Sequence, residues 1–256
     1  MTTLPADGIA QVTVLKPKPA VDARLVALTS RQGLPAEKFR ILGTRLVKFR
    51  TQRSLKNLLI TSCVPEEGKS FVAANLAVTL AGGQNQRVLL LGGDLRHPGL
   101  NSIFGFGKLT GLAEYLQGQA DLCQALYRVE RMPLWFLPPG NSTQQPADLL
   151  QSDRLAPLMA LLAESFDWVL VDSPPMVPWV DASSWARFTD GILLVVREEK
   201  TPKSLLAQAI ESLDGSSILG VVFNQDRRNM TGCDQYYQTY GGPQTDGQGD
   251  NGFRIH

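Results

Sequence analysis

The chain is poor in the residues that hold small secreted domains or transition-metal sites together. Its 256 residues include three cysteines and two histidines, and the cysteines are scattered without a CxxC pair. An odd, scattered set of cysteines argues against a disulfide framework, and so few thiols and imidazoles argue against a zinc site. We therefore expect a protein of the reducing cytoplasm.

Long apolar runs are also missing. The densest apolar stretch, residues 191–196, has the length of a strand and falls far short of the roughly 20 residues that cross a bilayer. The first ten residues have no basic head followed by an apolar core, so we expect no secretory signal. With 43% hydrophobic and 19% charged residues, the composition is typical of one large α/β domain or two small ones.

Charge of one sign does not dominate, since 25 Lys and Arg balance 24 Asp and Glu. A net charge of +1 does not favour non-specific nucleic-acid binding, and we expect no nucleic-acid partner. The charges are unevenly placed, because residues 1–60 carry 11 basic and 3 acidic side chains. This basic region, which includes Lys48, Arg50 and Arg53, is either a docking surface for a membrane or an acidic partner, or a solvated helix face.

Apolar segments of strand length alternate with amphipathic segments along most of the chain. The pattern predicts strands at 57–62, 87–91, 134–137, 166–171, 191–196 and 218–223, and helices at 22–28, 37–50, 70–80, 146–165, 182–188 and 202–213. This alternation indicates an α/β fold with a doubly wound, mostly parallel sheet. Such folds bind ligands at the carboxyl ends of their strands, so we expect the chemistry in the residues just after each strand.

Composition divides the chain into three regions. Residues 1–36 are proline-rich and weakly periodic, which predicts a flexible N-terminal arm, and residues 37–224 form the α/β domain. Residues 225–256 contain six glycines and neither leucine nor valine, so they cannot bury enough apolar surface to order themselves. We expect them to form a flexible C-terminal tail.

A candidate phosphate-binding loop follows the strand predicted at 57–62. Gly68, Lys69 and Ser70 stand at the start of the next helix, where backbone N–H groups and the positive end of the helix dipole attract phosphate. The lysine would reach the β- and γ-phosphates and the hydroxyl would bind Mg²⁺. A capped helix with a surface lysine is the alternative, but the buried strand before the loop favours nucleotide binding.

This loop departs from the usual GxxxxGK[ST] pattern. Cys63 occupies the place of the first glycine, so only the second half of the pattern is present. Glu66 and Glu67 lie beside the expected phosphates. Because like charges repel, we expect both carboxylates to point outward.

Motifs after later strands extend a resemblance that begins at this loop. PEEGKS followed by FVAANLAVTLA resembles the P-loop of the bacterial tyrosine kinases of capsule and exopolysaccharide assembly, which usually reads PGEGKS before a helix containing AANLA. VLLLGGDLRHP at 88–98 resembles the family's acidic motif hhhDxDxR, and VLVDSPP at 169–175 resembles its Walker B strand hhhDxPP. The resemblance continues through DA at 181–182, GILLVVR at 191–197 and GVVFN at 220–224 to a tyrosine cluster.

The resemblance implies a P-loop NTPase-like fold, related to ATPases of the MinD/ParA class, with ATP and Mg²⁺ as cofactors. The residues that it implies for nucleotide binding are Glu67, Gly68, Lys69, Ser70, Phe71 and, near the adenine, Asn224. The implied catalytic residues are Lys69, Asp94 and Asp172, and the implied metal ligands, partly through water, are Ser70, Asp94 and Asp172. The implied phosphate acceptors are Tyr236, Tyr237 and Tyr240, and the implied oligomer contact consists of Glu37 and Arg40.

Two glycines depart from the family pattern. Gly92 replaces the first acid of DxD, which removes a group expected near the metal and the tyrosine hydroxyl, and Asp94 is the candidate to take its place. Gly43 replaces the second arginine of the ring-forming ExxRxxR motif, so ring closure of a homo-oligomer is in doubt. A plain surface ion pair between Glu37 and Arg40 is the alternative interpretation.

The resemblance predicts an ATP-dependent protein-tyrosine kinase that phosphorylates its own tail in trans and regulates bacterial exopolysaccharide export. It further implies recruitment to the inner face of the plasma membrane by a polysaccharide co-polymerase that activates the chain, with a phosphotyrosine phosphatase and other tyrosine substrates as further partners. Two alternatives remain open. One is a catalytically weak nucleotide-binding scaffold, which Gly92 and Gly43 favour; the other is a MinD/ParA-like ATPase switch.

Overall fold

A computed structural model of the chain describes residues 12–17, 24–83, 86–141, 145–177, 181–197, 201–213 and 218–224, and the backbone of 253–255. The strands are β1 (Thr13–Leu15), β2 (Asn57–Ser62), β3 (Val88–Gly92), β4 (Tyr127–Val129), β5 (Leu134–Leu137), β6 (Trp168–Asp172), β7 (Gly191–Arg197), β8 (Ile218–Asn224) and β9 (Phe253–Ile255). The helices are α2 (Val26–Thr29), α3 (Leu34–Gln52), α4 (Lys69–Ala81), α5 (Leu100–Phe104), α6 (Leu112–Leu116), α7 (Leu122–Ala125), α8 (Pro146–Leu150), α9 (Leu155–Ser165), α10 (Asp181–Ala186) and α11 (Lys203–Glu211).

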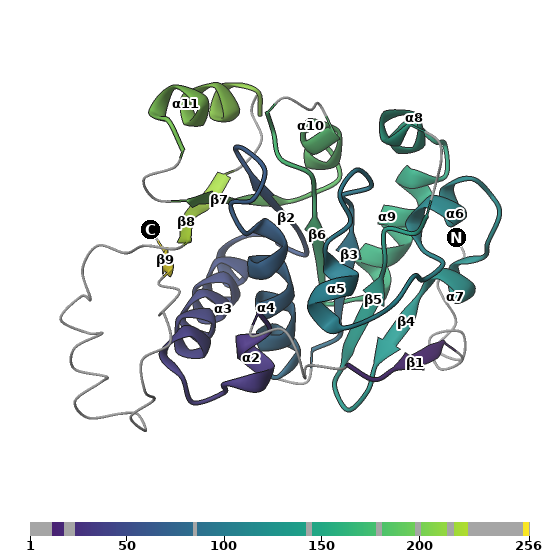
Figure 1. Cartoon of the computed structure of the whole chain (residues 1–256), viewed down its shortest axis with the longest axis horizontal. Helices are drawn as coiled ribbons and strands as arrows, with labels where there is room; N and C mark the ends of the chain where they lie inside the picture. The colour runs from purple at the N-terminus through teal and green to yellow at the C-terminus, as the bar shows by residue number, and fades with distance from the viewer. Residues whose placement is uncertain are drawn as a thin grey trace.

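These strands form one sheet in the order β1-β4-β5-β3-β6-β2-β7-β8-β9. Neighbouring strands are parallel except in the pairs β4–β5 and β8–β9. Helices cover both faces (Figure 1), with α2 to α5 on one face and α6 to α11 on the other. This confirms the doubly wound, mostly parallel sheet, because helices on both faces shield a parallel sheet from water.

The two hydrophobic clusters of the core lie on opposite faces of the sheet. Along β2, Leu58 and Ile60 face the cluster under α3 and α4, whereas Leu59 faces the cluster on the other side. All three side chains are fully buried. A strand with buried residues on both faces reads as a continuous apolar run, which is why the sequence predicts β2 clearly.

The predicted helix at 146–165 is wrong in one respect, because it is two helices, α8 and α9. Residues 151–154 separate them, and the Ser152 hydroxyl accepts a hydrogen bond from the Arg154 N–H at 3.3 Å. Serine side chains that bond to nearby backbone compete with helical hydrogen bonding. The helix predicted at 37–50 is longer than expected, since α3 begins at Leu34 and ends at Gln52.

The arm predicted for residues 1–36 contains regular structure where it is described. Strand β1 pairs with β4, and α2, which the sequence predicts within 22–28, lies at 26–29. In the predicted tail, β9 pairs antiparallel with β8. The acceptor tyrosines Tyr236, Tyr237 and Tyr240 lie outside the described residues, so their role stays a prediction.

A buried amide attaches the N-terminal segment to α4. Asn75 is fully buried, its Oδ1 accepts from the Ala27 N–H at 2.9 Å, and its Nδ2 donates to the carbonyls of Arg24 at 2.7 Å and Phe71 at 2.9 Å. Asn75 belongs to the AANLA sequence of the helix. Its side chain therefore joins α4 to the Arg24 carbonyl before α2 and to the Ala27 N–H in the first turn of α2, where the helix itself offers no acceptor.

Replacing Asn75 by alanine should destabilise the chain by about 2–4 kcal/mol, because it removes three hydrogen bonds between a buried amide and partly buried backbone, each worth about 1 kcal/mol. Urea denaturation measures this change in the free energy of unfolding. Thr79→Ala is the matched control on the same helix, since the Thr79 hydroxyl bonds only to the carbonyl of Asn75 among the described contacts, and it should cost about 1 kcal/mol or less. Equal losses in the two variants would contradict this role of Asn75.

Candidate functional site

Strands β3, β6 and β2 are neighbours in the centre of the sheet, so their carboxyl ends meet at one edge. The loop after β2 leads into α4, the loop after β3 carries Asp94, and β6 ends in Asp172. In the sheet register, Asp172 lies opposite Ile60 on one side and Gly92 on the other. The topology therefore brings together the residues that the sequence predicts for the site, although they are up to about 100 positions apart.

A left-handed glycine shapes the candidate phosphate loop. Gly68 has φ +92°, and a Cβ atom there would lie 2.0 Å from Nδ2 of Asn224. Asn224, at the end of β8, is buried and donates a hydrogen bond from Nδ2 to the carbonyl of Glu67 at 2.8 Å. The structure therefore places Asn224 against the backbone of the loop, while its contact with an adenine ring remains a prediction.

The expectation that both glutamates of the loop point outward is wrong for Glu67. Glu66 is exposed, but Glu67 is only 1% exposed. Its Oε2 accepts from the Val64 N–H at 2.9 Å, and its Oε1 accepts from the Arg197 N–H at 3.2 Å and from the Thr201 hydroxyl. Three donors compensate the buried carboxylate, which joins the loop to the segment after β7.

Cys63 fills the place of the first glycine with a buried, inert side chain. Its side chain is fully buried, and burial together with the neighbouring charge of Glu67 raises the pKa of the thiol to about 12. The thiol therefore stays protonated and is neither a nucleophile nor a metal ligand at neutral pH.

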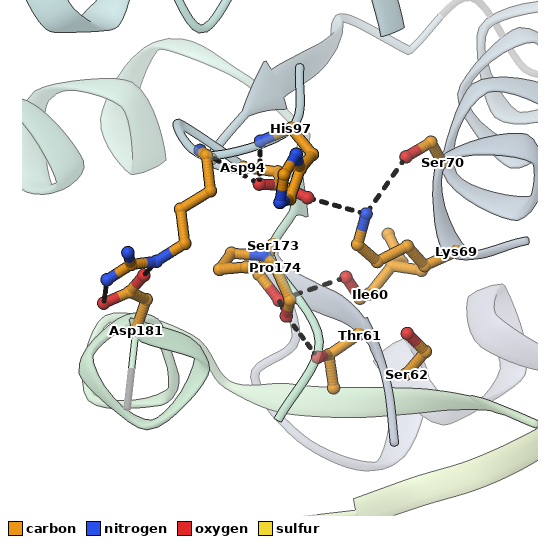
Figure 2. Close-up of polar contacts among 12 residues, drawn as sticks. Ile60, Thr61, Ser62, Lys69, Ser70, Asp94, His97, Ser173, Pro174 and Asp181 are labelled. Carbon is orange, nitrogen blue, oxygen red and sulfur yellow. Dashed lines mark hydrogen bonds and ion pairs between the residues drawn. The ribbon is translucent and has the colours of Figure 1, made fainter. Parts of the chain in front are cut away.

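Lys69 forms an ion pair with Asp94 (Figure 2), and the charge of Asp172 also acts on it. Its Nζ is 2.8 Å from Oδ2 of Asp94 and 3.4 Å from the hydroxyl of Ser70. Burial lowers the pKa of Lys69, but the charges of Asp172 and Asp94 together outweigh it and raise the pKa above its ordinary value. The ammonium group therefore stays charged at neutral pH, as a phosphate ligand must.

Asp172 is the least compensated charge of the site. It is 1% exposed, and its Oδ1 has no hydrogen-bond partner. Burial raises the pKa of this carboxyl to about 6, although the charge of Lys69 and a hydrogen bond from Ser70 act in the opposite direction. A buried carboxylate oxygen without a partner is an available ligand for a cation.

The oxygen donors of the site suit Mg²⁺. Ser70, Asp94 and Asp172 supply a hydroxyl and two carboxylates, and Mg²⁺ prefers such oxygen ligands in small number, with water in the remaining positions. Within the described part of the chain, no group of three His, Cys, Asp or Glu side chains could hold a metal. The residues present therefore fit a Mg²⁺ ion that a nucleotide brings with it.

Backbone and side-chain contacts hold the loop after β3. Oδ1 of Asp94 accepts from the N–H groups of His97 at 2.9 Å and Arg96 at 3.2 Å (Figure 2). Arg96 forms a two-pronged ion pair with Asp181 of α10, with Nε 2.5 Å from Oδ2 and Nη2 3.3 Å from Oδ1. The Asp-Ala pair at 181–182 thus contributes a charge that fixes the acidic motif.

The remaining predicted residues lie on α3 or pack against it. Arg40 forms an ion pair with Glu37 one turn earlier on α3, which is the geometry of the alternative interpretation, and an oligomer contact stays a prediction. Gly43 is buried, and a Cβ there would meet side chains of α4 at 3.5 Å. Phe71 packs edge-on against Phe39, with ring centroids 5.6 Å apart.

Comparisons with known proteins agree with this geometry. No protein-family model matches the chain. The tyrosine-protein kinase YwqD of Bacillus subtilis is 33% identical over 217 residues, which cover 84% of this chain and 91% of YwqD. The chain belongs to the family of bacterial tyrosine-protein kinases. The succinoglycan biosynthesis transport protein ExoP of Rhizobium meliloti is 36% identical over 196 residues, and the match spans 72% of this chain but 25% of ExoP.

Solved structures of this kinase family have the same fold. The kinase domain of the Escherichia coli tyrosine kinase ETK superposes with a TM-score of 0.73 at 28% identity, covering 77% of this chain and 78% of that domain. The cell division ATPase MinD of Pyrococcus furiosus superposes with a TM-score of 0.57 at 27% identity, covering 68% of this chain and 74% of MinD. Both results confirm the predicted P-loop kinase fold and its relation to MinD-like ATPases.

Exchanging Glu67 for glutamine should destabilise the chain by about 2 kcal/mol, because the neutral amide loses charge-assisted bonds and turns one N–H toward a donor. Glu66→Gln is the matched control in the neighbouring, exposed position and should change stability by less than about 0.5 kcal/mol. Chemical denaturation without nucleotide compares the two variants. An equal effect of both substitutions would contradict the structural role of the Glu67 carboxylate.

Asp172→Asn should stabilise the nucleotide-free chain increasingly as the pH rises from about 4 to about 6. Below this range the carboxyl is protonated in the folded and unfolded states, whereas above it the folded state bears the cost of a buried charge. With a pKa raised from 3.8 to about 6, the advantage at neutral pH reaches about 3 kcal/mol. Urea denaturation at several pH values measures it, with Asp153→Asn, at an exposed position, as the matched control.

Proposed function

We propose that the chain transfers the γ-phosphoryl group of ATP to tyrosine hydroxyl groups and that its own tail tyrosines, Tyr236, Tyr237 and Tyr240, are acceptors in trans. The observation that carries this proposal is the charged Lys69 at the start of α4, 2.8 Å from Asp94 and beside Asp172. The 33% identity between this chain and the tyrosine-protein kinase YwqD, over most of the length of both, supports the same reaction.

Phosphoryl transfer depends chiefly on positioning and on stabilising negative charge, and this chain has groups for both. Lys69 and the first N–H groups of α4 would bind the β- and γ-phosphates, with Gly68 allowing their close approach. Ser70, Asp94 and Asp172 would hold Mg²⁺, which when bound neutralises phosphate charge. Because Gly92 has no side chain, Asp94 is the carboxylate that would accept the proton of the tyrosine hydroxyl, a contribution of about 10²–10⁴-fold.

We further propose that the kinase serves bacterial exopolysaccharide or capsule export. The name of ExoP, a biosynthesis transport protein, supports this setting. No helix in the described ranges is long and apolar enough to span a bilayer. In this proposal a membrane polysaccharide co-polymerase recruits the chain to the inner face of the plasma membrane and activates it, and the basic residues Lys48, Arg50 and Arg53 are the proposed docking surface.

Incubating the chain with Mg-ATP and the cytoplasmic segment of its membrane partner should produce phosphotyrosine in the tail, detected by mass spectrometry. Lys69→Met should abolish the signal, because the phosphates lose their cationic ligand. Replacing Tyr236, Tyr237 and Tyr240 together by phenylalanine should remove most of it, whereas Tyr115→Phe, in α6, is the matched control and should not.

Two results would contradict the kinase proposal and select an alternative. If the chain binds nucleotide but forms no phosphotyrosine, it is a scaffold of the same export system. The glycine at position 92, in place of an acid, favours this alternative. ATP hydrolysis without phosphotyrosine would indicate a MinD-like switch, which the structural likeness to MinD permits.

A further inference from the structure

The acid that the family motif places at position 92 has no room in this chain. A Cβ atom on Gly92 would lie 2.5 Å from Cδ and 2.9 Å from the backbone N of Pro139. Pro139 is buried, and its turn is held because Leu112 N–H donates to the Pro138 carbonyl at 2.8 Å and Ala113 N–H to the Pro139 carbonyl at 3.0 Å. The proline therefore cannot move away cheaply, and a side chain at 92 would displace the end of β3.

The next residue, Gly93, also has no room for a side chain, because Trp185 packs against it. A Cβ atom on Gly93 would lie 2.8 Å from Cε2 and 2.9 Å from Nε1 of Trp185. This tryptophan, on α10, is fully buried and donates a hydrogen bond from Nε1 to the Gly93 carbonyl at 3.1 Å. The Gly93 N–H in turn donates to the carbonyl of Asp172 at 2.8 Å. The backbone directly before Asp94 is thus held by hydrogen bonds to Trp185 on one side and to the end of β6 on the other.

Helix α10 contacts the Asp94 loop on both sides of the carboxylate. Trp185 holds Gly93, the residue before Asp94, and Asp181 holds Arg96, two residues after it. The Asp94 carboxylate between these contacts is 2.8 Å from Lys69. A shift of the backbone at 92 or 93 would therefore change the distance of Asp94 from both Lys69 and Asp172.

We propose that Pro139 and Trp185 are positioning residues for Asp94, and that they occupy the volume that side chains at positions 92 and 93 would need. Among the described residues, the carboxylates that this site offers to Mg²⁺ are then Asp94 and Asp172, and adding an acid at 92 does not improve the site. This inference rests on the proposed function, because it takes Asp94 as part of the Mg-nucleotide site.

The test measures ADP binding to the full chain by calorimetry, once with Mg²⁺ and once with EDTA. Gly93→Ala should lower the affinity in Mg²⁺ by about 10–100-fold, as loss of an outer-shell partner does in metal sites, and leave the affinity in EDTA unchanged. Trp185→Leu, which removes the hydrogen bond to the Gly93 carbonyl, should lower the affinity in Mg²⁺ in the same way. Gly107→Ala is the control, because nothing lies within 4 Å of its Cβ position.

A second pair of variants keeps the inference testable if Trp185→Leu does not fold. Gly92→Ala and Gly92→Asp should both lower the Mg²⁺-dependent affinity, because each adds the atom that meets Pro139. Tighter Mg-ADP binding by Gly92→Asp than by wild type would overturn the proposal, as would unchanged binding by Gly93→Ala.

The readout separates this inference from the proposed function. It needs nucleotide and Mg²⁺ but no tyrosine phosphorylation, so a chain that binds Mg-ADP normally and never forms phosphotyrosine still tests it. A loss that is equal in Mg²⁺ and in EDTA would show a merely structural role for Pro139 and Trp185 and would also overturn the proposal.

Discussion

The candidate site depends on the balance between one buried ammonium group and two buried carboxylates. Lys69 offsets Asp94 directly and Asp172 across a short distance, yet Asp172 keeps an oxygen without a hydrogen-bond partner. One cation for two anions leaves the site one positive charge short, and low-dielectric surroundings make that shortage costly. Ser70, Asp94 and Asp172 would hold a Mg²⁺ ion whose charge would offset this shortage, which would leave Lys69 available to the phosphates.

Rigid contacts from distant parts of the chain keep this balance in place. The Glu67 carboxylate joins the phosphate loop to the segment after β7, and Asn224 joins it to the end of β8. On the other side, α10 holds the loop of Asp94 through Asp181 and Trp185. Each contact joins segments 80 or more residues apart, so the site forms only when the whole sheet has formed.

Much of the fold follows from the sequence, because buried strands such as β2 and β7 contain continuous apolar runs, LLI and ILLVV, and long helices have a clear period. The sequence does not predict β1 and β4, since each has three residues and their pairing joins segments more than 100 positions apart. In the site, the motifs correctly predict that Lys69, Asp94 and Asp172 meet. The prediction that Glu67 points outward is wrong, because the sequence shows its charge but not the three hydrogen-bond donors that the fold brings to it. The sequence also does not predict the roles of Pro139 and Trp185, because they act by filling the space beside Gly92 and Gly93, and no sequence motif records such packing.

The buried thiol of Cys63 in the phosphate loop affects how this kinase reacts with oxidants. Nucleophilic attack on peroxide or on an alkylating agent requires a thiolate, and Cys63 is both buried and held protonated beside Glu67. Cys123, by contrast, is exposed on α7, far along the sheet from β2. Peroxide stress that modifies the surface sulfur therefore leaves the nucleotide cradle chemically intact while the domain stays folded.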